Sequence, residues 1–98
     1  MATENQIKKQ IFIQEHHIEW ETKGKYYREQ RQKLGISQKL IAESTQCSDK
    51  TIRRFEKGLP VQRRPLLEAA YDLAIKYIPL KRQIDAGQID FVEKEFDF

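Results

Sequence analysis

Hydrophobic residues recur through the middle of the chain with the period of an α-helix, and turn-forming residues divide this pattern into short segments. The first segment spans residues 24–34 and ends before Gly35, a residue suited to the left-handed position after a helix. Ser37 is a good N-cap for a second helix, which would turn Leu40 and Ile41 inward. The pattern therefore predicts two consecutive short helices.

A third short helix is predicted directly after the second. Ser48 can cap its first turn and Gly58 stops it, so we expect this helix over residues 49–57. Ile52 and Phe55 form its apolar side because they lie one turn apart. Only a tight turn is left between the second and third helices.

A longer amphipathic segment follows the loop at residues 59–64. Pro65 suits the first turn of a fourth helix, and Pro79 is expected to end or kink it. Residues 80–86 can then form a fifth helix, closed by Gly87. The apolar side predicted for the fourth helix consists of Leu66, Leu67, Ala70, Leu73, Ala74 and Tyr77.

The two ends of the chain have weaker patterns. Residues 11–13 are rich in β-forming side chains, whereas the spacing of Ile7, Ile11 and Ile18 also fits a helix, and both alternatives stay open. Residues 88–98 are acidic and alternate poorly. The expected division is an N-terminal extension (residues 1–22), a central domain (23–87) and an acidic C-terminal tail (88–98).

Composition is that of a globular protein with one domain: 98 residues, 39% hydrophobic and 34% charged. No stretch approaches the roughly 20 apolar residues of a membrane-spanning helix. Residues 1–9 lack the apolar core of a signal peptide, and the single cysteine, Cys47, cannot form an internal disulfide. We therefore expect a cytoplasmic protein that does not contact a membrane.

Charge is distributed unevenly along the chain. Residues 23–64 hold twelve Lys and Arg against four Asp and Glu, a local net charge of +8, although the whole chain carries only +3. Both ends are acidic. A basic segment of this kind is typical of a protein that binds a polyanion, although a solvated helical surface would have the same composition.

The two short helices within residues 38–57 have the pattern of a helix-turn-helix. Ala42 lies where the helices would cross, and its small side chain lets their backbones approach. The amide groups and the positive dipole end of the second helix would face a phosphate or the edges of bases. The basic residues of this second helix are Lys50, Arg53, Arg54 and Lys57.

These residues resemble the Cro/CI-type helix-turn-helix family, the XRE-like group of phage repressors and bacterial regulators. The resemblance covers about residues 24–78 and combines the motifs Arg-x-x-Leu-Gly-Ile-Ser-Gln (31–38), Ile-Ala (41–42) and Ile-x-x-Phe-Glu-Lys-Gly (52–58). It implies an all-α, lambda-repressor-like domain of five helices with short extensions, of which the N-terminal one could include a small β element.

The resemblance also implies a function. It identifies the chain as a sequence-specific DNA-binding transcriptional regulator and favours a repressor that binds double-stranded operator DNA. One recognition helix, here residues 49–57, covers too few base pairs for useful specificity, so a homodimer is expected to place two such helices in the major groove.

Site residues follow from the resemblance position by position. Gln38 opens the second helix, where relatives bond a phosphate and brace the recognition helix, and Arg31 is expected to form a structural ion pair with Glu56. Arg63 and Arg64 fall in the loop where relatives place arginines against the DNA backbone or minor groove. The predicted DNA-binding residues are Gln38, Ser48, Asp49, Lys50, Thr51, Arg53, Arg54, Lys57, Arg63 and Arg64.

The sequence departs from the family pattern at two positions. Gln46 stands in the turn where a glycine usually adopts the left-handed conformation, which predicts a wider or mildly strained turn. Asp49 stands where relatives often carry an adenine-reading Gln. Its carboxylate can accept a hydrogen bond from a cytosine amino group or simply favour the positive end of the helix, and both remain open.

Catalysis and cofactor binding have no support in the sequence. His16 and His17 are adjacent and have no partner at zinc-ligand spacing, and the chain has no phosphate-binding loop or nucleophile motif. Cys47, at the turn, is expected to be a small buried hydrophobic residue. We therefore expect a protein that is not an enzyme and that binds no metal and no cofactor.

An alternative function is protein binding. In this interpretation the chain is an antitoxin-like or adaptor protein, whose helix-turn-helix is a scaffold and whose acidic, aromatic tail binds a protein partner. Both ends hold large apolar side chains, which we expect to pack on the helical core and build the homodimer contact. A solvated acidic tail after Gly87 is the competing interpretation.

Overall fold

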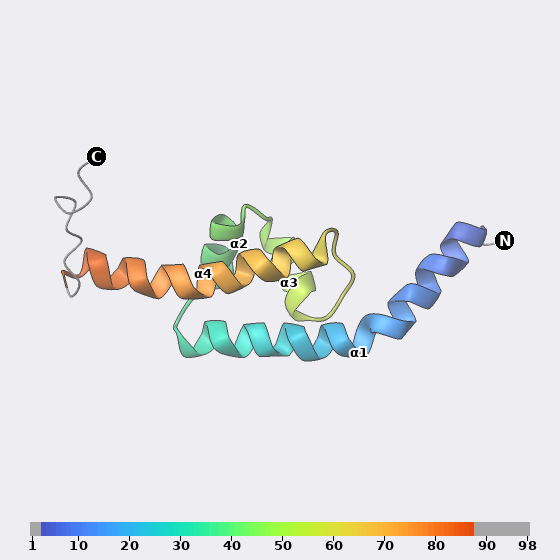
Figure 1. The fold of residues 1–98 in the computed structure, drawn as a ribbon, viewed down its shortest axis with the longest axis horizontal. Helices are drawn as coiled ribbons and strands as arrows, with labels where there is room; N and C mark the ends of the chain where they lie inside the picture. Colours follow the sequence, from blue (N-terminus) through green and yellow to red (C-terminus); the bar gives the residue numbers. More distant parts are fainter. Residues whose placement is uncertain (1–2, 88–98) are drawn as a thin grey trace.

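Four helices account for most of the computed structural model, which describes residues 3–87 (Figure 1). They are α1 (Glu4–Lys33), α2 (Gln38–Thr45), α3 (Asp49–Glu56) and α4 (Arg64–Asp85). The predicted all-α helix-turn-helix fold is confirmed, although residues 3–87 contain four helices rather than five and no strand. The expected tail at residues 88–98 lies outside the described residues.

The first helix is much longer than predicted. It begins at Glu4, where the Thr3 and Gln6 side chains each accept a hydrogen bond from the other residue's backbone amide, at 3.2 and 2.8 Å. Gly24, expected to open this helix, lies in its interior, and the alternative of a strand at residues 11–13 is wrong. The expected boundary between residues 22 and 23 falls within the same continuous helix.

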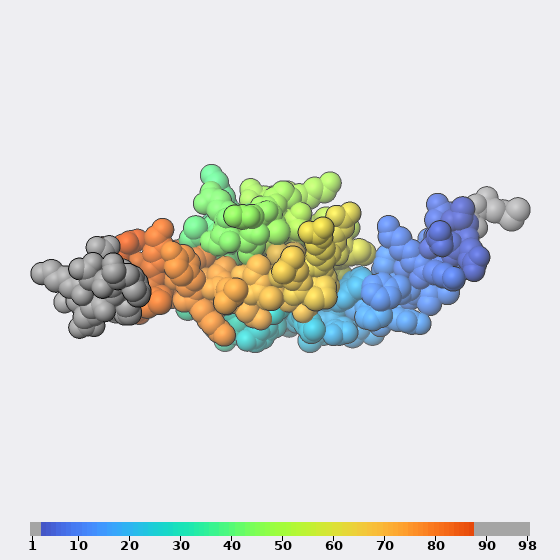
Figure 2. Space-filling model, turned by 45° about the horizontal axis from the view of Figure 1, so that its top comes forward, coloured from blue at the N-terminus to red at the C-terminus, as the bar shows by residue number. Residues whose placement is uncertain are grey.

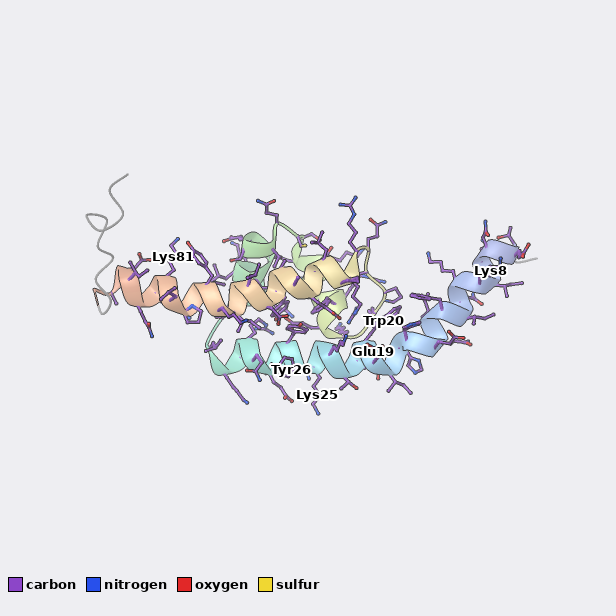
Figure 3. The ribbon with its side chains drawn as sticks, in the orientation of Figure 1. Lys8, Glu19, Trp20, Lys25, Tyr26 and Lys81 are labelled. Carbon is purple, nitrogen blue, oxygen red and sulfur yellow. The ribbon has the colours of Figure 1, made fainter. Side chains whose placement is uncertain are left out.

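The N-terminal part of α1, residues 4–18, forms an arm that extends beyond the other helices (Figures 1 and 2). The helix bends where the arm leaves the body, near the labelled Glu19 and Trp20 (Figure 3). Here the hydroxyl of Thr22 donates a hydrogen bond to the carbonyl oxygen of Ile18 at 2.9 Å. Such a bond back to the preceding turn often bends a helix, which gives the bend a local cause.

The last helix, α4, continues through Pro79 to Asp85, so the predicted break and the separate fifth helix are wrong. Tertiary contacts hold the helix on both sides of the proline. Ile78 is buried in the core, and the Arg82 guanidinium donates to the carbonyl oxygen of Leu34 at 3.1 Å, at the end of α1. These contacts offset the missing amide hydrogen of the proline.

We expect Pro79→Ala to stabilise the protein by about 2–3 kcal/mol. Proline in a helix interior is about 3 kcal/mol less favourable than alanine, and its restriction of the unfolded chain returns up to about 1 kcal/mol of this. Thermal unfolding followed by circular dichroism should show a higher Tm. Pro65→Ala, at the first turn of α4 where proline is well suited, is the matched control and should give no gain. An unchanged Tm for Pro79→Ala would contradict this prediction.

The core lies between the part of α1 that follows the arm and the other three helices. Its largest fully buried side chains are Ile41, Ile52, Phe55 and Tyr71. The rings of Tyr27, Phe55 and Tyr71 form a cluster with centroids 4.9–5.6 Å apart. This cluster joins α1, α3 and α4, so α3 is fixed on its inner side by aromatic packing.

The apolar residues of α4 form two faces rather than the single one predicted. Leu67 and Ala74 are buried as expected, and they share the core face with Tyr71 and Ile78. Leu66, Leu73 and Tyr77, however, are more than half exposed, so the single apolar side that was predicted does not coincide with the core face. Both sets recur every three or four residues, which is why the sequence pattern did not separate them.

Two glycines let α1 approach the end of α3 closely. A Cβ atom at Gly24 would lie 2.5 Å from the carbonyl oxygen of Glu56 and 2.6 Å from that of Phe55. A Cβ atom at Gly58, which has a φ of +77°, would lie 2.6 Å from the backbone nitrogen of Glu21. A side chain at either position would force the two backbones apart.

Candidate nucleic-acid interface

A three-residue turn, residues 46–48, joins α2 to α3. Gln46 has the left-handed conformation, with φ 58° and ψ 36°, so the turn keeps the geometry that relatives build with glycine. Ser48 caps α3 by accepting a hydrogen bond from the backbone amide of Thr51 at 3.1 Å, and Ser37 caps α2 in the same way. Both predicted caps are confirmed.

A buried polar network, consisting of Arg31, Gln38, Glu56 and Tyr71, connects all four helices. Its centre is the Glu56 carboxylate at the end of α3, which is only 4% exposed. It accepts four hydrogen bonds: from Nε and Nη2 of Arg31 (both 2.9 Å), Nε2 of Gln38 (3.0 Å) and the hydroxyl of Tyr71 (2.8 Å). The orientation of α3 is therefore set by one donor residue each from α1, α2 and α4.

The charges within this Glu56 network support one another. Burial alone would lower the pKa of Arg31, but its hydrogen bonds and charge attraction to Glu56 outweigh burial and raise it. Burial also raises the pKa of Tyr71, and the hydrogen bond to Glu56 raises it further. Arg31 thus stays positive and Tyr71 stays a neutral donor, so Glu56 keeps its partners over the whole physiological pH range.

The outward face of α3 carries a basic stripe of Lys50, Arg53 and Lys57. These residues follow an i, i+3, i+7 spacing, which places them on one side of the helix, and all three are exposed. None of them forms an ion pair within residues 3–87. Their charges are therefore available to an external anion, while the opposite face of α3 is held by the core.

Other predicted site residues lie around this stripe. Ser48 and Asp49 are exposed at the N-terminus of α3, whereas Thr51 and Gln38 are half-buried. Lys39, which the resemblance did not assign, is also exposed at the start of α2. Its position next to Gln38, a predicted phosphate contact, is the sequence feature that could have placed Lys39 beside this site. Cys47 is half-buried and packs against the core, so it is less buried than expected.

Arg64, predicted to contact DNA, points into the protein. Its side chain is 7% exposed and donates to three backbone carbonyl oxygens, those of Leu59 (3.2 Å), Trp20 (3.1 Å) and Phe55 (3.4 Å). Burial lowers the pKa of Arg64, and the nearby charge of Glu68 opposes this effect. Because these donors are already bonded to backbone carbonyl oxygens, Arg64 stabilises the loop after α3 rather than presenting its guanidinium to solvent. Arg63 is exposed.

Arg54 is only half-buried, but its guanidinium is engaged by the loop after α3. Its Nε and Nη2 atoms both donate to the carbonyl oxygen of Pro60, at 3.3 and 3.0 Å. Only Nη1 is left for a base edge unless these bonds break. Lys50 and Arg53 are exposed, and unlike Arg54 neither forms a side-chain hydrogen bond within residues 3–87.

The comparisons with known proteins agree with this geometry. A family model described as Helix-turn-helix matches residues 28–77, just over half of the chain. The matched segment contains α2, the turn, α3 and the whole Glu56 network. A search of curated proteins and a search of solved structures each give no match. Within residues 3–87, no helix has the length and apolar character to cross a membrane. On the α2–turn–α3 geometry and the family match, this chain belongs to the Cro/CI-type (XRE-like) helix-turn-helix family of DNA-binding transcription regulators.

Proposed function

We propose that the protein is a repressor that binds operator DNA sequence-specifically as a homodimer, with α3 in the major groove. The observation that carries this proposal is the basic stripe of Lys50, Arg53 and Lys57. It is exposed and has no ion pair among residues 3–87, on a helix whose other side is fixed by Glu56. A rigid helix with an open cationic face fits the major groove.

The N-terminal end of α3 supports the same placement. Ser48 accepts a hydrogen bond from the amide of Thr51, and the other amides of the first turn have no partner within the helix, so they can bond a phosphate or a base edge. Asp49 is exposed at this end and forms no ion pair within residues 3–87, so its carboxylate is available to a cytosine amino group. The predicted base contacts are therefore centred on Asp49, Lys50 and Arg53.

The alternative, an antitoxin-like or adaptor protein, depends on the acidic aromatic residues at 88–98, which lie outside the described residues. A partner bound by that tail would not require the basic side chains of α3 to be exposed and free of ion pairs. We therefore give operator binding priority, and the experiment that follows distinguishes the two functions.

In vitro selection from a pool of randomised DNA duplexes tests the proposal without knowledge of the operator. The full chain should enrich a two-fold symmetric site, with half-sites one helical turn apart or a multiple of it, about 34–36 Å centre to centre. Binding to the enriched site should weaken steeply as salt concentration rises. A pool that stays random after repeated rounds would contradict sequence-specific binding and leave the protein-binding alternative.

We expect Lys50→Ala to weaken binding to the enriched site by about 1–2 kcal/mol and to relax the preference at one base position. Fluorescence anisotropy on a panel of single-base variants measures both effects. Lys25→Ala is the matched control, because it removes the same charge from a side chain that points away from α2 and α3 (Figure 3). If both variants bind the whole panel like the unaltered protein, Lys50 does not read bases.

A further inference from the structure

A groove lies between the arm of α1 and the loop that leads into α4. It has a volume of about 600 Å³, a size typical of sites that take a small molecule. Figure 3 labels Trp20, one of its lining residues, where the arm leaves the body beside this loop. We call this hollow the arm groove. Its apolar and aromatic lining includes Phe12, His16, Trp20, Pro60, Val61 and Pro65.

Three rings of α1 form one wall of the arm groove. Phe12, His16 and Trp20 follow at intervals of four residues, so they lie on one side of the helix. The ring centroids of Phe12 and His16 are 4.1 Å apart, and those of His16 and Trp20 are 5.7 Å apart. Phe12 is nevertheless 54% exposed, so much of its surface remains available to a further ring. A planar aromatic ligand can pack on such a wall at similar centroid distances.

The arm groove carries more positive than negative charge. Four cationic side chains line it against two carboxylates, a net charge of +2 with histidine counted as neutral. Both carboxylates are paired with Lys23, Glu19 at 3.1 Å and Glu68 at 3.6 Å. Lys9 and Arg63, by contrast, are exposed and form no ion pair within residues 3–87. These two charges are therefore available to an anion.

A buried guanidinium adds to the positive charge. Arg64 lines the arm groove and is 7% exposed, and its Nε atom has no hydrogen-bond partner in the part of the chain that the structure describes. The Glu68 carboxylate lies 3.7 Å from this Nε atom but is shared with Lys23. An anion in the arm groove would thus be attracted by Arg64 as well as by the two free cations.

We propose that the arm groove binds a small molecule that has a planar aromatic ring and an anionic group. The ring packs between the aromatic wall of α1 and the apolar loop residues Pro60 and Val61, and Lys9 and Arg63 hold the anionic group. Exposed apolar side chains and unpaired surface cations are each ordinary on their own. Their convergence in one hollow of ligand size is what indicates a binding site.

Nuclear magnetic resonance on the full chain tests this site with 2-naphthoate as the probe. Trp20 is the single tryptophan of the sequence, so its indole N–H signal is unambiguous and reports on the arm groove. Titration should shift this signal to saturation with a dissociation constant of about 1 mM or less, as expected for a ligand of this size. The neutral compound 2-naphthalenemethanol has the same rings and should bind about ten-fold more weakly, because it lacks the charge.

Substitutions test the two halves of the site separately. Lys9→Gln combined with Arg63→Gln should raise the dissociation constant of 2-naphthoate by about ten-fold or more, because both charge-assisted contacts are lost. Lys25→Gln combined with Lys33→Gln removes the same charge from residues of α1 outside the arm groove and should have no effect. Circular dichroism should show an unchanged fold, since all four side chains are exposed.

The aromatic wall has its own matched pair of variants. Phe12→Ala should weaken 2-naphthoate binding by about five-fold or more, because a base or ring stacked on an aromatic side chain loses that contact. Ile11→Ala is the control, since Ile11 is the neighbouring residue, is 49% exposed and does not line the arm groove. Equal loss in both variants would show that the ring of Phe12 does not contact the ligand.

Other outcomes overturn the proposal. A Trp20 signal that does not move rules out the site, as expected if residues 88–98 of the same chain fill the arm groove. Equal affinity for 2-naphthoate and 2-naphthalenemethanol rules out an anion site. A Lys9→Gln/Arg63→Gln variant that binds the probe as tightly as the Lys25→Gln/Lys33→Gln control removes the role assigned to the two free cations.

The arm groove also bears on DNA binding, and this step rests on the proposed function. Pro60, Val61 and Arg63 line both the arm groove and a second hollow, which includes Ser48 and Thr51 at the start of α3. A ligand that holds Arg63 withdraws it from the predicted DNA contact, so saturating 2-naphthoate should lower affinity for the selected DNA site by about five-fold or more. Unchanged DNA affinity would refute this coupling and leave the ligand site intact. A chain that enriches no DNA site would refute the proposed function without changing the Trp20 titration.

Discussion

Glu56→Ala is expected to destabilise the protein by about 3–5 kcal/mol, the cost of leaving one member of a buried ion pair without its partner. The substitution removes the acceptor of four hydrogen bonds and leaves the Arg31 guanidinium buried beside an apolar methyl group. The Tyr71 hydroxyl and the Gln38 amide lose their carboxylate acceptor at the same time. A small domain has a total stability of only about 5–15 kcal/mol, so this loss is a large part of it.

Thermal unfolding would show this loss as a fall in Tm of roughly 12–40 °C, at about 4–8 °C per kcal/mol for a domain of this size. Glu56→Gln keeps the shape and one acceptor oxygen, so its fall should be smaller. Glu43→Ala removes an exposed carboxylate from α2 and should change Tm by only a few degrees. A Glu56→Ala variant that unfolds at the same temperature as the Glu43→Ala variant would show that the network does not hold the helices together.

The helix-turn-helix itself could be predicted from sequence because its determinants are local. Ser37 and Ser48 bond amides three residues away, and Gly58 ends α3 at a left-handed position, so each signal lies beside the boundary it sets. The arm of α1 could not be predicted with the same certainty. Its apolar residues fit a helix but also, at residues 11–13, a strand, and most of them are exposed, so no buried face decides between the two patterns.

The direction in which an arginine points was the least predictable part of the site. Arg63 and Arg64 are neighbours with the same side chain, yet one is exposed and the other is buried against Trp20, 44 positions away in the sequence. No local pattern reports a contact at that distance. The two apolar faces of α4 were merged for a related reason, since periodicity identifies apolar faces but not which partner covers each.

Gly24→Ala tests whether helix propensity or the close contact with α3 determines the effect of a side chain at this position of α1. Helix propensity alone predicts a gain of about 1 kcal/mol, because glycine in a helix interior is less favourable than alanine by that amount. The structure predicts the opposite sign. The new methyl group would lie 2.5–2.8 Å from backbone atoms of Phe55 and Glu56, and backbone atoms cannot rotate away as a flexible side chain can. We expect a net loss of about 3 kcal/mol, at the upper end of the range for overpacked sites.

The loss should extend beyond the contact itself, because pushing α1 away from α3 also separates Arg31 from Glu56. Chemical denaturation should therefore show a lower midpoint with an unchanged slope, since the surface exposed on unfolding stays the same. Gln14→Ala, on the exposed arm of the same helix, reports the effect of alanine without a tertiary contact and should be neutral within about 0.5 kcal/mol. A Gly24→Ala variant at least as stable as the unaltered protein would mean that α1 and α3 do not meet at this glycine.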